Sequence, residues 1–281
     1  MRRAGLRSGH HQRRQCRIDI LTALGYTQAP VSGLPAIRNS GVVTAGTSST
    51  VIEAGSWVAI YGTNLAPTSR TWTDAEIVNG NLPTSLSGVS VTIDGKAAYV
   101  YYISPTQINV QAPNDTATGQ VSVVVKTSAG SSAAATATMA SVSPAFFTLD
   151  GRYVAGVIPS ISGVYLPNTP YSYDLVGPAG KFPYSTRPVK RGELVELYMT
   201  GFGPCKQPVP AGLVIGGANP TIYPVSLSIG GVAVNATAYV VGAGLYQMNV
   251  TIPATVASGD NVLQAIVNGV QTQLGVAISV Q

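Results

Sequence analysis

Two stretches of the chain share one pattern: residues 55–67 read GSWVAIYGTNLAP, and residues 192–204 read GELVELYMTGFGP. They align without a gap at an offset of 137 residues. In both, a glycine precedes alternating apolar residues, which is typical of a β-strand with one face in a core. A tight bend follows each and is expected to place Leu65 or Phe202 beneath a sandwich. The chain is therefore expected to contain one β-module twice.

The repeat continues after both stretches. Residues 91–95 (VTIDG) match residues 227–231 (LSIGG), and residues 107–113 (QINVQAP) match residues 247–253 (QMNVTIP). The turn dipeptides Asp94-Gly95 and Gly230-Gly231 predict two-residue hairpins of type I′. Gln107 and Gln247 begin strands, where we expect their amides to bond loop backbone rather than a ligand. These repeated residues are interpreted as scaffold.

Short alternating segments separated by Gly, Pro, Asn and Asp predict strands at Val58–Tyr61, Val89–Ile93, Ala98–Ile103, Ile108–Gln111 and Val121–Thr127. No stretch has a sustained apolar period of 3.6 residues. The predicted fold class is therefore all-β, with two tandem Ig-like antiparallel β-sandwich modules at residues 40–145 and 146–281. The second module carries a Tyr/Pro-rich insertion at about residues 151–186, and residues 1–39 form a basic tail that we expect to be disordered.

Charge is concentrated in that tail. Of the 281 residues only 10% are charged, and the formal net charge is +5. Six of the 16 basic residues precede the first acidic residue, Asp19, so the remainder, with 10 basic and 11 acidic residues, is nearly neutral. A neutral body offers no field for nucleic acid. The tail is interpreted as a mis-assigned start or part of a longer secreted protein, with a disordered terminus or a nucleic-acid arm as alternatives.

The residues needed for most catalytic and metal sites are missing from the body. Both histidines, His10 and His11, lie in the tail, which excludes His-based triads and metal sites elsewhere. Whether the two cysteines, Cys16 and Cys205, form a disulfide is left open. Glu193 and Glu196 are three residues apart on a predicted strand and should face opposite sides. We predict no catalytic residue, no metal and no cofactor, although an enzyme using two carboxylates stays an alternative.

Membrane and export signals are incomplete. No run of about 18 apolar residues occurs, so no transmembrane span is expected. The basic start is not followed by an apolar segment of the kind that a signal peptide needs. Location must therefore be inferred from other features of the chain.

Tyrosines are the main candidates for binding. Tyr and Pro together form flat amphipathic surface suited to sugars or peptides. The favoured alternative is that the insertion forms an edge hairpin and packs its rings on the second sandwich. In the first module, two tyrosines should share one strand face, with Tyr102 on the other. The candidate binding residues are Tyr165, Tyr171, Tyr173 and Tyr184 in the insertion, and Tyr99 and Tyr101 in the first module.

Residues 55–65 and 104–113 resemble the IPT/TIG type of immunoglobulin-like domain. More closely, residues 40–281 resemble the paired C-terminal module of large secreted proteins from Solibacter-type acidobacteria. The motifs that carry this resemblance are residues 82–91 (LPTSLSGVSV), 102–111 (YISPTQINVQ), 187–204 (RPVKRGELVELYMTGFGP) and 244–250 (GLYQMNV). The resemblance implies a bacterial, exported module without catalytic residues, located outside the cell or on its surface.

The sequence thus favours a non-enzymatic, exported structural or interaction module of a bacterial surface or secreted protein. We expect its body to be monomeric and its partners to be other surface proteins or a polysaccharide, with no nucleic acid. The alternative is a carbohydrate-binding accessory module that uses the Tyr-rich insertion.

Overall fold

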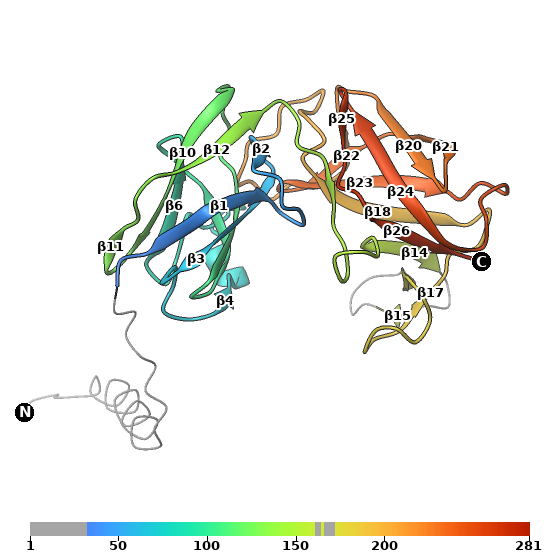
Figure 1. Ribbon diagram of the computed structural model, residues 1–281, viewed down its shortest axis with the longest axis horizontal. Helices are drawn as coiled ribbons and strands as arrows, with labels where there is room; N and C mark the ends of the chain where they lie inside the picture. The colour runs from blue at the N-terminus through green and yellow to red at the C-terminus, as the bar shows by residue number, and fades with distance from the viewer. Residues whose placement is uncertain (1–32, 161–163, 166–171) are drawn as a thin grey trace, which may run out of the picture.

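The structure, a computed structural model, describes residues 33–160, 164–165 and 172–281 of the chain. Most of the predicted tail, Cys16 and Tyr171 lie outside these residues. The described chain is all-β, with one short 3₁₀ helix, η1 (Asp74–Glu76). Two β-sandwiches lie side by side, the first drawn in blue to green and the second in yellow to red (Figure 1). The predicted fold class is confirmed.

The first sandwich consists of two sheets. One has the order β1-β3-β9-β8-β4, comprising β1 (Ala36–Thr44), β3 (Trp57–Thr63), β9 (Gln107–Gln111), β8 (Tyr99–Ile103) and β4 (Arg70–Thr71). The other has the order β2-β12-β10-β6-β5, with β11 beside β10 and β7 beside β6. Its strands are β2 (Val51–Glu53), β12 (Ala135–Ala140), β10 (Gly119–Thr127), β6 (Val89–Ile93), β5 (Ser85–Leu86), β11 (Gly130–Ser131) and β7 (Lys96–Ala97).

The second sandwich repeats this plan with an enlarged sheet. That sheet has the order β15-β16-β14-β18-β23-β22-β19, with β13 beside β18 and β17 beside β16. Its strands are β13 (Ala145–Phe146), β14 (Gly156–Ser160), β15 (Val164–Tyr165), β16 (Ser172–Val176), β17 (Thr186–Arg187), β18 (Leu194–Thr200), β19 (Asn219–Pro220), β22 (Tyr239–Gly242) and β23 (Leu245–Thr251). The smaller sheet comprises β20 (Val225–Ile229), β21 (Val232–Ala236), β24 (Gly259–Val267), β25 (Val270–Gln271) and β26 (Ala277–Val280).

The Tyr/Pro-rich insertion extends the larger sheet. β14 pairs antiparallel with β18 on one side and with β16 on the other, so the insertion adds a hairpin at the sheet edge. Arg187 anchors this addition: its guanidinium forms ion pairs with Asp174 at 2.7 Å and with Glu193 at 2.8 Å. The edge hairpin expected from the sequence is present.

The local sequence signals correspond to local geometry. Asp94 and Gly95 both have positive φ, at 50° and 72°, and so do Gly230 and Gly231, at 57° and 81°. Type I′ turns require positive φ at both central positions, so the two predicted hairpins are confirmed. The predicted bends also bring Leu65 and Phe202 fully into the two cores.

One expectation about the scaffold is wrong. The side-chain amide of Gln107 donates to Asn109 Oδ1 at 2.8 Å, not to loop backbone. The repeated pair behaves identically, with Gln247 donating to Asn249 Oδ1 at 2.7 Å. Residues two apart on a strand share a face, which makes this contact easier than a bond to the neighbouring loop.

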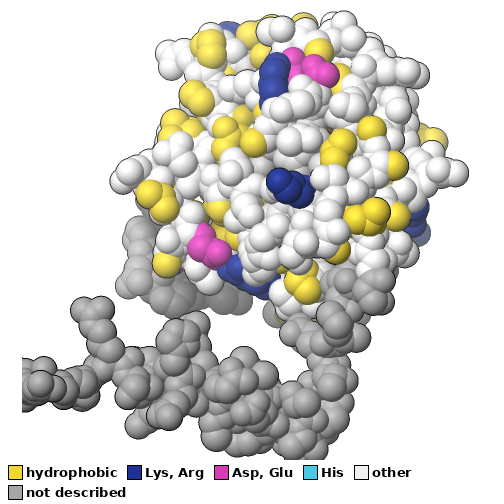
Figure 2. All heavy atoms as spheres, turned by 90° about the vertical axis from the view of Figure 1, so that its left-hand side faces the viewer, with side chains coloured by type: hydrophobic (Ala, Val, Ile, Leu, Met, Phe, Trp, Pro, Cys, Tyr) yellow, Lys and Arg dark blue, Asp and Glu magenta, His cyan; other side chains and the backbone are white. Residues whose placement is uncertain are grey.

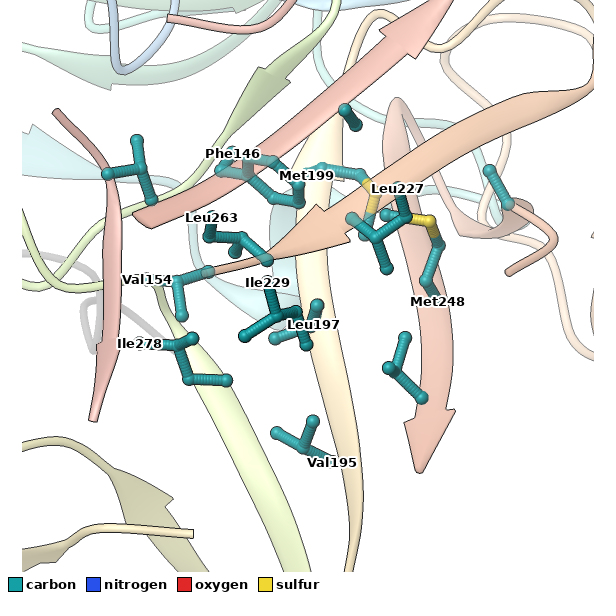
Figure 3. Packing of buried hydrophobic residues seen from close by; sticks show 14 of the residues in the cluster. Phe146, Val154, Val195, Leu197, Met199, Leu227, Ile229, Met248, Leu263 and Ile278 are labelled. Carbon is teal, nitrogen blue, oxygen red and sulfur yellow. The ribbon is translucent and has the colours of Figure 1, made fainter. Parts of the chain in front are cut away.

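Each sandwich has its own apolar core. In the second, alternating residues of β18, such as Val195 and Leu197, meet Leu227 and Ile229 from the opposite sheet (Figure 3). The first core is built likewise, with Val58 and Ile60 of β3 facing Val91 of β6. Because side chains alternate along a strand, the residues between these core positions point away from the core.

The surface carries few charges. Figure 2 shows the side of the first sandwich, where a few basic and acidic side chains, some of them side by side, lie among uncharged polar and apolar ones. Within the described ranges, no helix is long and apolar enough to cross a membrane.

Candidate functional site

A buried carboxyl joins the two sandwiches. Glu53, at the end of β2, is only 3% exposed, and both of its carboxyl oxygens lie 3.1 Å from the backbone nitrogen of Gly203 in the second sandwich. Ser143, in the linker, also donates its backbone N–H to this carboxyl, at 3.3 Å. Among the residues that the structure covers, no Lys or Arg forms an ion pair with Glu53.

Burial raises the pKa of Glu53 from its usual value of 4.5 to about 8, against the lowering effect of its hydrogen bonds. The hydroxyl of Tyr246 lies 3.1 Å from Glu53 Oε1 and 2.9 Å from the carbonyl oxygen of Gly203. When Glu53 is protonated, its O–H can donate to Tyr246 while Tyr246 donates to Gly203. When Glu53 is ionised, Tyr246 can turn its proton to the carboxylate. Tyr246 has one hydroxyl proton, so both of its contacts are hydrogen bonds only when Glu53 is protonated, and the carbonyl of Gly203 loses this donor when Glu53 is ionised.

Further hydrogen bonds surround this centre. Trp57 at the start of β3 donates its backbone N–H to Thr200 Oγ1 at 2.9 Å, and Thr200 donates to the carbonyl of Gly244 at 2.9 Å. Thr200 is fully buried. The side-chain oxygen of Gln111 accepts the backbone N–H of Gly212 at 2.8 Å. Thr200 of the second sandwich therefore bonds backbone of the first, and Gln111 of the first bonds backbone of the second.

A loop of the second sandwich, residues 206–218, extends onto the first, and we call it the crossing loop. The backbone N–H of Leu82 donates to the carbonyl of Gly212 at 2.7 Å, and that of Val214 donates to the carbonyl of Gly80 at 2.7 Å. Asn81 and Leu213 thereby form an antiparallel bridge between the sandwiches. Backbone bonds of this kind fix the register of the two segments.

An aromatic cleft lies beside these contacts, between the sandwiches, with a volume of about 460 Å³. Trp57 on β3, Tyr101 on β8 and Trp72 just after β4 contribute rings from strands of one sheet. The ring centroids lie 4.7 Å apart for Trp72–Tyr101, 5.6 Å for Trp57–Tyr101 and 6.2 Å for Trp57–Trp72. The full lining is Ala45, Trp57, Trp72, Ile77, Leu82, Tyr101, Asn109, Phe147, Val214, Ile215, Gly242, Ala243 and Leu245.

Of the candidate tyrosines of the first module, Tyr99 precedes a β-bulge and Tyr101 is the extra residue of that bulge. Pairing between β8 and β9 is regular at Val100 and at Tyr102, with an irregularity between them at Tyr101. Tyr101 enters the cleft and is 40% exposed. Tyr99 packs against Gly212 of the crossing loop, where an added methyl carbon would lie 1.9 Å from its ring.

Tyr102 was expected on the strand face opposite Tyr99 and Tyr101, and this is wrong. Tyr99 pairs with Gln111 and Tyr102 with Asn109, so both lie on one outward face of the sheet, while Val100 and Ile103 take the core positions. The extra residue of a bulge shifts the alternation by one position, so Ile103 rather than Tyr102 takes the inward place after Val100.

Of the candidate tyrosines of the insertion, Tyr173 and Tyr184 do not line the cleft. Tyr184 is 42% exposed and stacks on Phe182, with ring centroids 5.4 Å apart and planes 7° apart. Tyr173 is half-buried on β16, and Tyr165 belongs to β15. Sequence reasoning selected these residues and Tyr101 but missed Trp57 and Trp72. One signal in the sequence could have pointed to them: both tryptophans of the chain belong to the first module.

No metal site is evident among the described residues, where no three His, Cys, Asp or Glu side chains gather. Cys205 is a free, half-buried thiol close to Glu53. Burial raises its pKa, and the neighbouring Glu53 adds to that rise. A protonated thiol is a weak nucleophile, which argues against catalysis by Cys205.

Comparison with known families finds one match, which covers most of the first sandwich. Residues 42–151 match the IPT/TIG domain. This match supports the IPT/TIG-like repeat inferred from sequence, since the second sandwich repeats the motifs of the IPT/TIG region. A search of the curated proteins finds no relative.

Several solved structures resemble the chain at low identity. SGBP-B of the Bacteroides ovatus mixed-linkage glucan utilization locus, solved in complex with a mixed-linkage heptasaccharide, is 10% identical with a TM-score of 0.31, over 83% of this chain and 43% of that chain. Domains 5–6 of the S-layer protein SbsC are 12% identical with a TM-score of 0.30, over 88% of this chain and 98% of theirs. The plexin A4 extracellular region is 11% identical with a TM-score of 0.29, over 90% of this chain and 19% of that region. The chain thus spans a small part of the plexin and under half of SGBP-B.

Proposed function

We propose that the chain is a non-enzymatic, exported interaction module of a bacterial surface or secreted protein, in which the two sandwiches act as one rigid unit. The observation that carries this proposal is the junction at Glu53. The buried carboxyl of Glu53 in the first sandwich accepts backbone N–H groups from the linker and from the second sandwich. Together with the backbone bonds of the crossing loop, it holds the relative position of the two bodies. Such a unit can present surfaces from both sandwiches to a partner at fixed spacing.

Calorimetry of the whole chain tests the rigid unit. Two domains that stabilise each other should melt in one transition, with equal calorimetric and van't Hoff enthalpies. Thr200 bonds both Trp57 and Gly244, so Thr200→Val should split this transition into two. The control, Thr73→Val at an exposed position, should leave one transition. Two transitions in the unmodified protein would show that the sandwiches are independent and would overturn the proposal.

Absence of catalysis requires a separate test. Several carboxylates of the described residues are engaged in ion pairs, as with Arg187 and Glu193 or Lys96 and Asp115. Hydrolysis of a polysaccharide or ester by the purified chain, abolished by replacing one carboxylate, would contradict the proposal.

Carbohydrate binding is a second candidate function, favoured by the exposed Tyr184 ring stacked on Phe182. Parallel aromatic rings give a flat apolar surface, which suits a sugar ring. If this function holds, Tyr184→Ala should abolish retention on a polysaccharide without changing the melting temperature. Equal retention of the variant and the unmodified protein would exclude Tyr184 as the site.

A further inference from the structure

The aromatic cleft is built by both sandwiches and therefore exists only in the joined unit. The first sandwich supplies its rings, and the second supplies Val214 and Ile215 from the crossing loop and Leu245 from β23. Tyr101 and Val214 remain 40% and 51% exposed, so the cleft is open to solvent. A large apolar concavity with solvent access is the usual form of a binding site.

The chemistry of the lining limits what can bind. No Lys, Arg, Asp or Glu lines the cleft, so a charged ligand would lose its hydration without gaining a partner. Apart from the indole N–H groups and the tyrosine hydroxyl, Asn109 is the only polar side chain among the lining residues. Its side-chain oxygen already accepts a hydrogen bond from Gln107. A sugar chain would find few hydrogen-bonding partners here.

The angles between the rings also disfavour a sugar. The three ring planes are inclined at 45°, 64° and 67° to one another, so they form ridges and grooves and no flat platform. A proline ring or a comparable apolar side chain can insert between inclined rings. Aromatic-lined grooves of this kind accept polyproline II segments, whose fixed backbone loses little entropy on binding.

The tryptophans provide the polar contact that such a segment needs. Neither indole N–H donates a hydrogen bond to any residue that the structure places. A polyproline II backbone makes no internal hydrogen bonds and exposes its carbonyl oxygens. Indole N–H groups at the cleft can donate to these carbonyls, which adds direction to an otherwise apolar contact.

We propose that this cleft binds an uncharged, extended, proline-rich segment of a partner protein, with Trp57, Trp72 and Tyr101 holding the proline rings. This inference rests on the proposed function, because it names the partner chemistry of the same two-sandwich unit.

Titration with a decaproline peptide tests the inference. The chain has two tryptophans, and both line the cleft, so intrinsic tryptophan fluorescence reports on this site alone. We expect a saturable change in fluorescence with decaproline and none with a Gly/Ser peptide of equal length or with cellohexaose. Saturation by cellohexaose alone, or equal responses to decaproline and the Gly/Ser peptide, would overturn the inference.

Variants then locate the binding by calorimetric titration. Trp72→Ala should raise the dissociation constant for decaproline at least tenfold, and Trp72→Phe should recover part of the loss. Val214→Asp keeps an exposed position exposed but puts a charge into the cleft, so it should weaken binding similarly without harming the fold. Val262→Asp, which puts the same charge at an exposed position of β24 outside the cleft, is the control and should bind normally.

The outcomes separate this inference from the proposed function. If the unmodified chain melts in one transition but does not bind decaproline at millimolar concentration, the inference fails and the rigid unit stands. If the chain melts in two transitions, the proposed function fails. If decaproline also binds the Val214→Asp variant, the site lies on the first sandwich alone, and the inference of a cleft shared by both sandwiches is overturned.

Discussion

At the scale of single residues, Glu53 links protonation to the contact between the sandwiches. Its pKa is raised by burial from 4.5 to about 8, so between these pH values the folded protein binds a proton that the unfolded chain does not. The stabilisation is fully present below pH 4.5 and is lost as the pH rises to about 8. We expect the free energy of unfolding to fall by up to about 1.4 kcal/mol per pH unit within this window.

Urea denaturation from pH 5 to pH 9 measures this slope, and Glu53→Gln should flatten it because the amide does not titrate. Glu76→Gln is the matched control: the backbone N–H of Thr73 and the side chain of Arg70 lower the pKa of Glu76, so it titrates below this range and its replacement should leave the slope unchanged. The other titratable groups facing Glu53 are Tyr246 and Cys205, and the pKa of each is raised by burial and by Glu53 itself. An unchanged slope in Glu53→Gln would assign the pH dependence elsewhere.

Gly212 tests the crossing loop at the same scale. Its φ is +77°, and an added methyl carbon would lie 1.9 Å from the ring of Tyr99. Gly212→Ala should therefore displace the loop from the first sandwich and lower the free energy of unfolding by about 1–3 kcal/mol. Gly216→Ala is the matched control in the same loop, because nothing lies within 4 Å of the added carbon. Equal effects of the two in urea denaturation would mean that the loop does not dock on Tyr99.

At the scale of elements, Arg187 ties the inserted hairpin to the sandwich. It bonds Asp174 on β16 and, through two nitrogens, Glu193 before β18, and all three side chains are about 28% exposed or less. Bidentate and partly shielded pairs are stronger than exposed ones, so Arg187→Gln should destabilise the protein by about 1 kcal/mol. It should also speed amide hydrogen exchange in β14 and β16.

Arg152 supplies the matched control, since its 3.3 Å ion pair with Asp260 involves a side chain that is 58% exposed. Arg152→Gln should change the free energy of unfolding by less than about 0.5 kcal/mol and leave exchange in the hairpin unaltered. Faster exchange in both variants would indicate a general loosening and contradict an anchoring role for Arg187.

The elements were also the part of the structure most open to prediction from sequence. Short-range patterns predicted the strands, because alternation and turn dipeptides such as Asp94-Gly95 act over a few residues. The register beyond a bulge was not predictable: nothing in the sequence YVYYI shows that Tyr101 is the extra residue. The faces of Tyr102 and Ile103 therefore had to come from the pairing of β8 with β9.

At the scale of the whole molecule, the junction was hidden from sequence analysis because its contacts join residues far apart in the chain. Glu53 and Tyr246 are 193 positions apart, and no local pattern distinguishes Glu53 from an exposed strand-end carboxylate. Sequence analysis predicted only part of the aromatic cleft, because it selected Tyr101 as a candidate binding residue but not Trp57 or Trp72. These three rings lie together because the strand order β3-β9-β8-β4 places them on one sheet, and the cleft is completed by residues of the second sandwich.

The same junction breaks the equivalence of the two repeats. At the offset of 137 residues, Trp57 corresponds to Leu194. Trp57 is covered in part by the second sandwich, whereas Leu194 begins β18 at 42% exposure. Trp57→Ser should therefore lower the free energy of unfolding by about 2 kcal/mol or more, because it removes apolar contact between the sandwiches. Leu194→Ser should change it by less than about 0.5 kcal/mol, as expected for an exposed position. Urea denaturation of both variants measures the difference, and equal losses would mean that the sandwiches do not meet at Trp57 in solution.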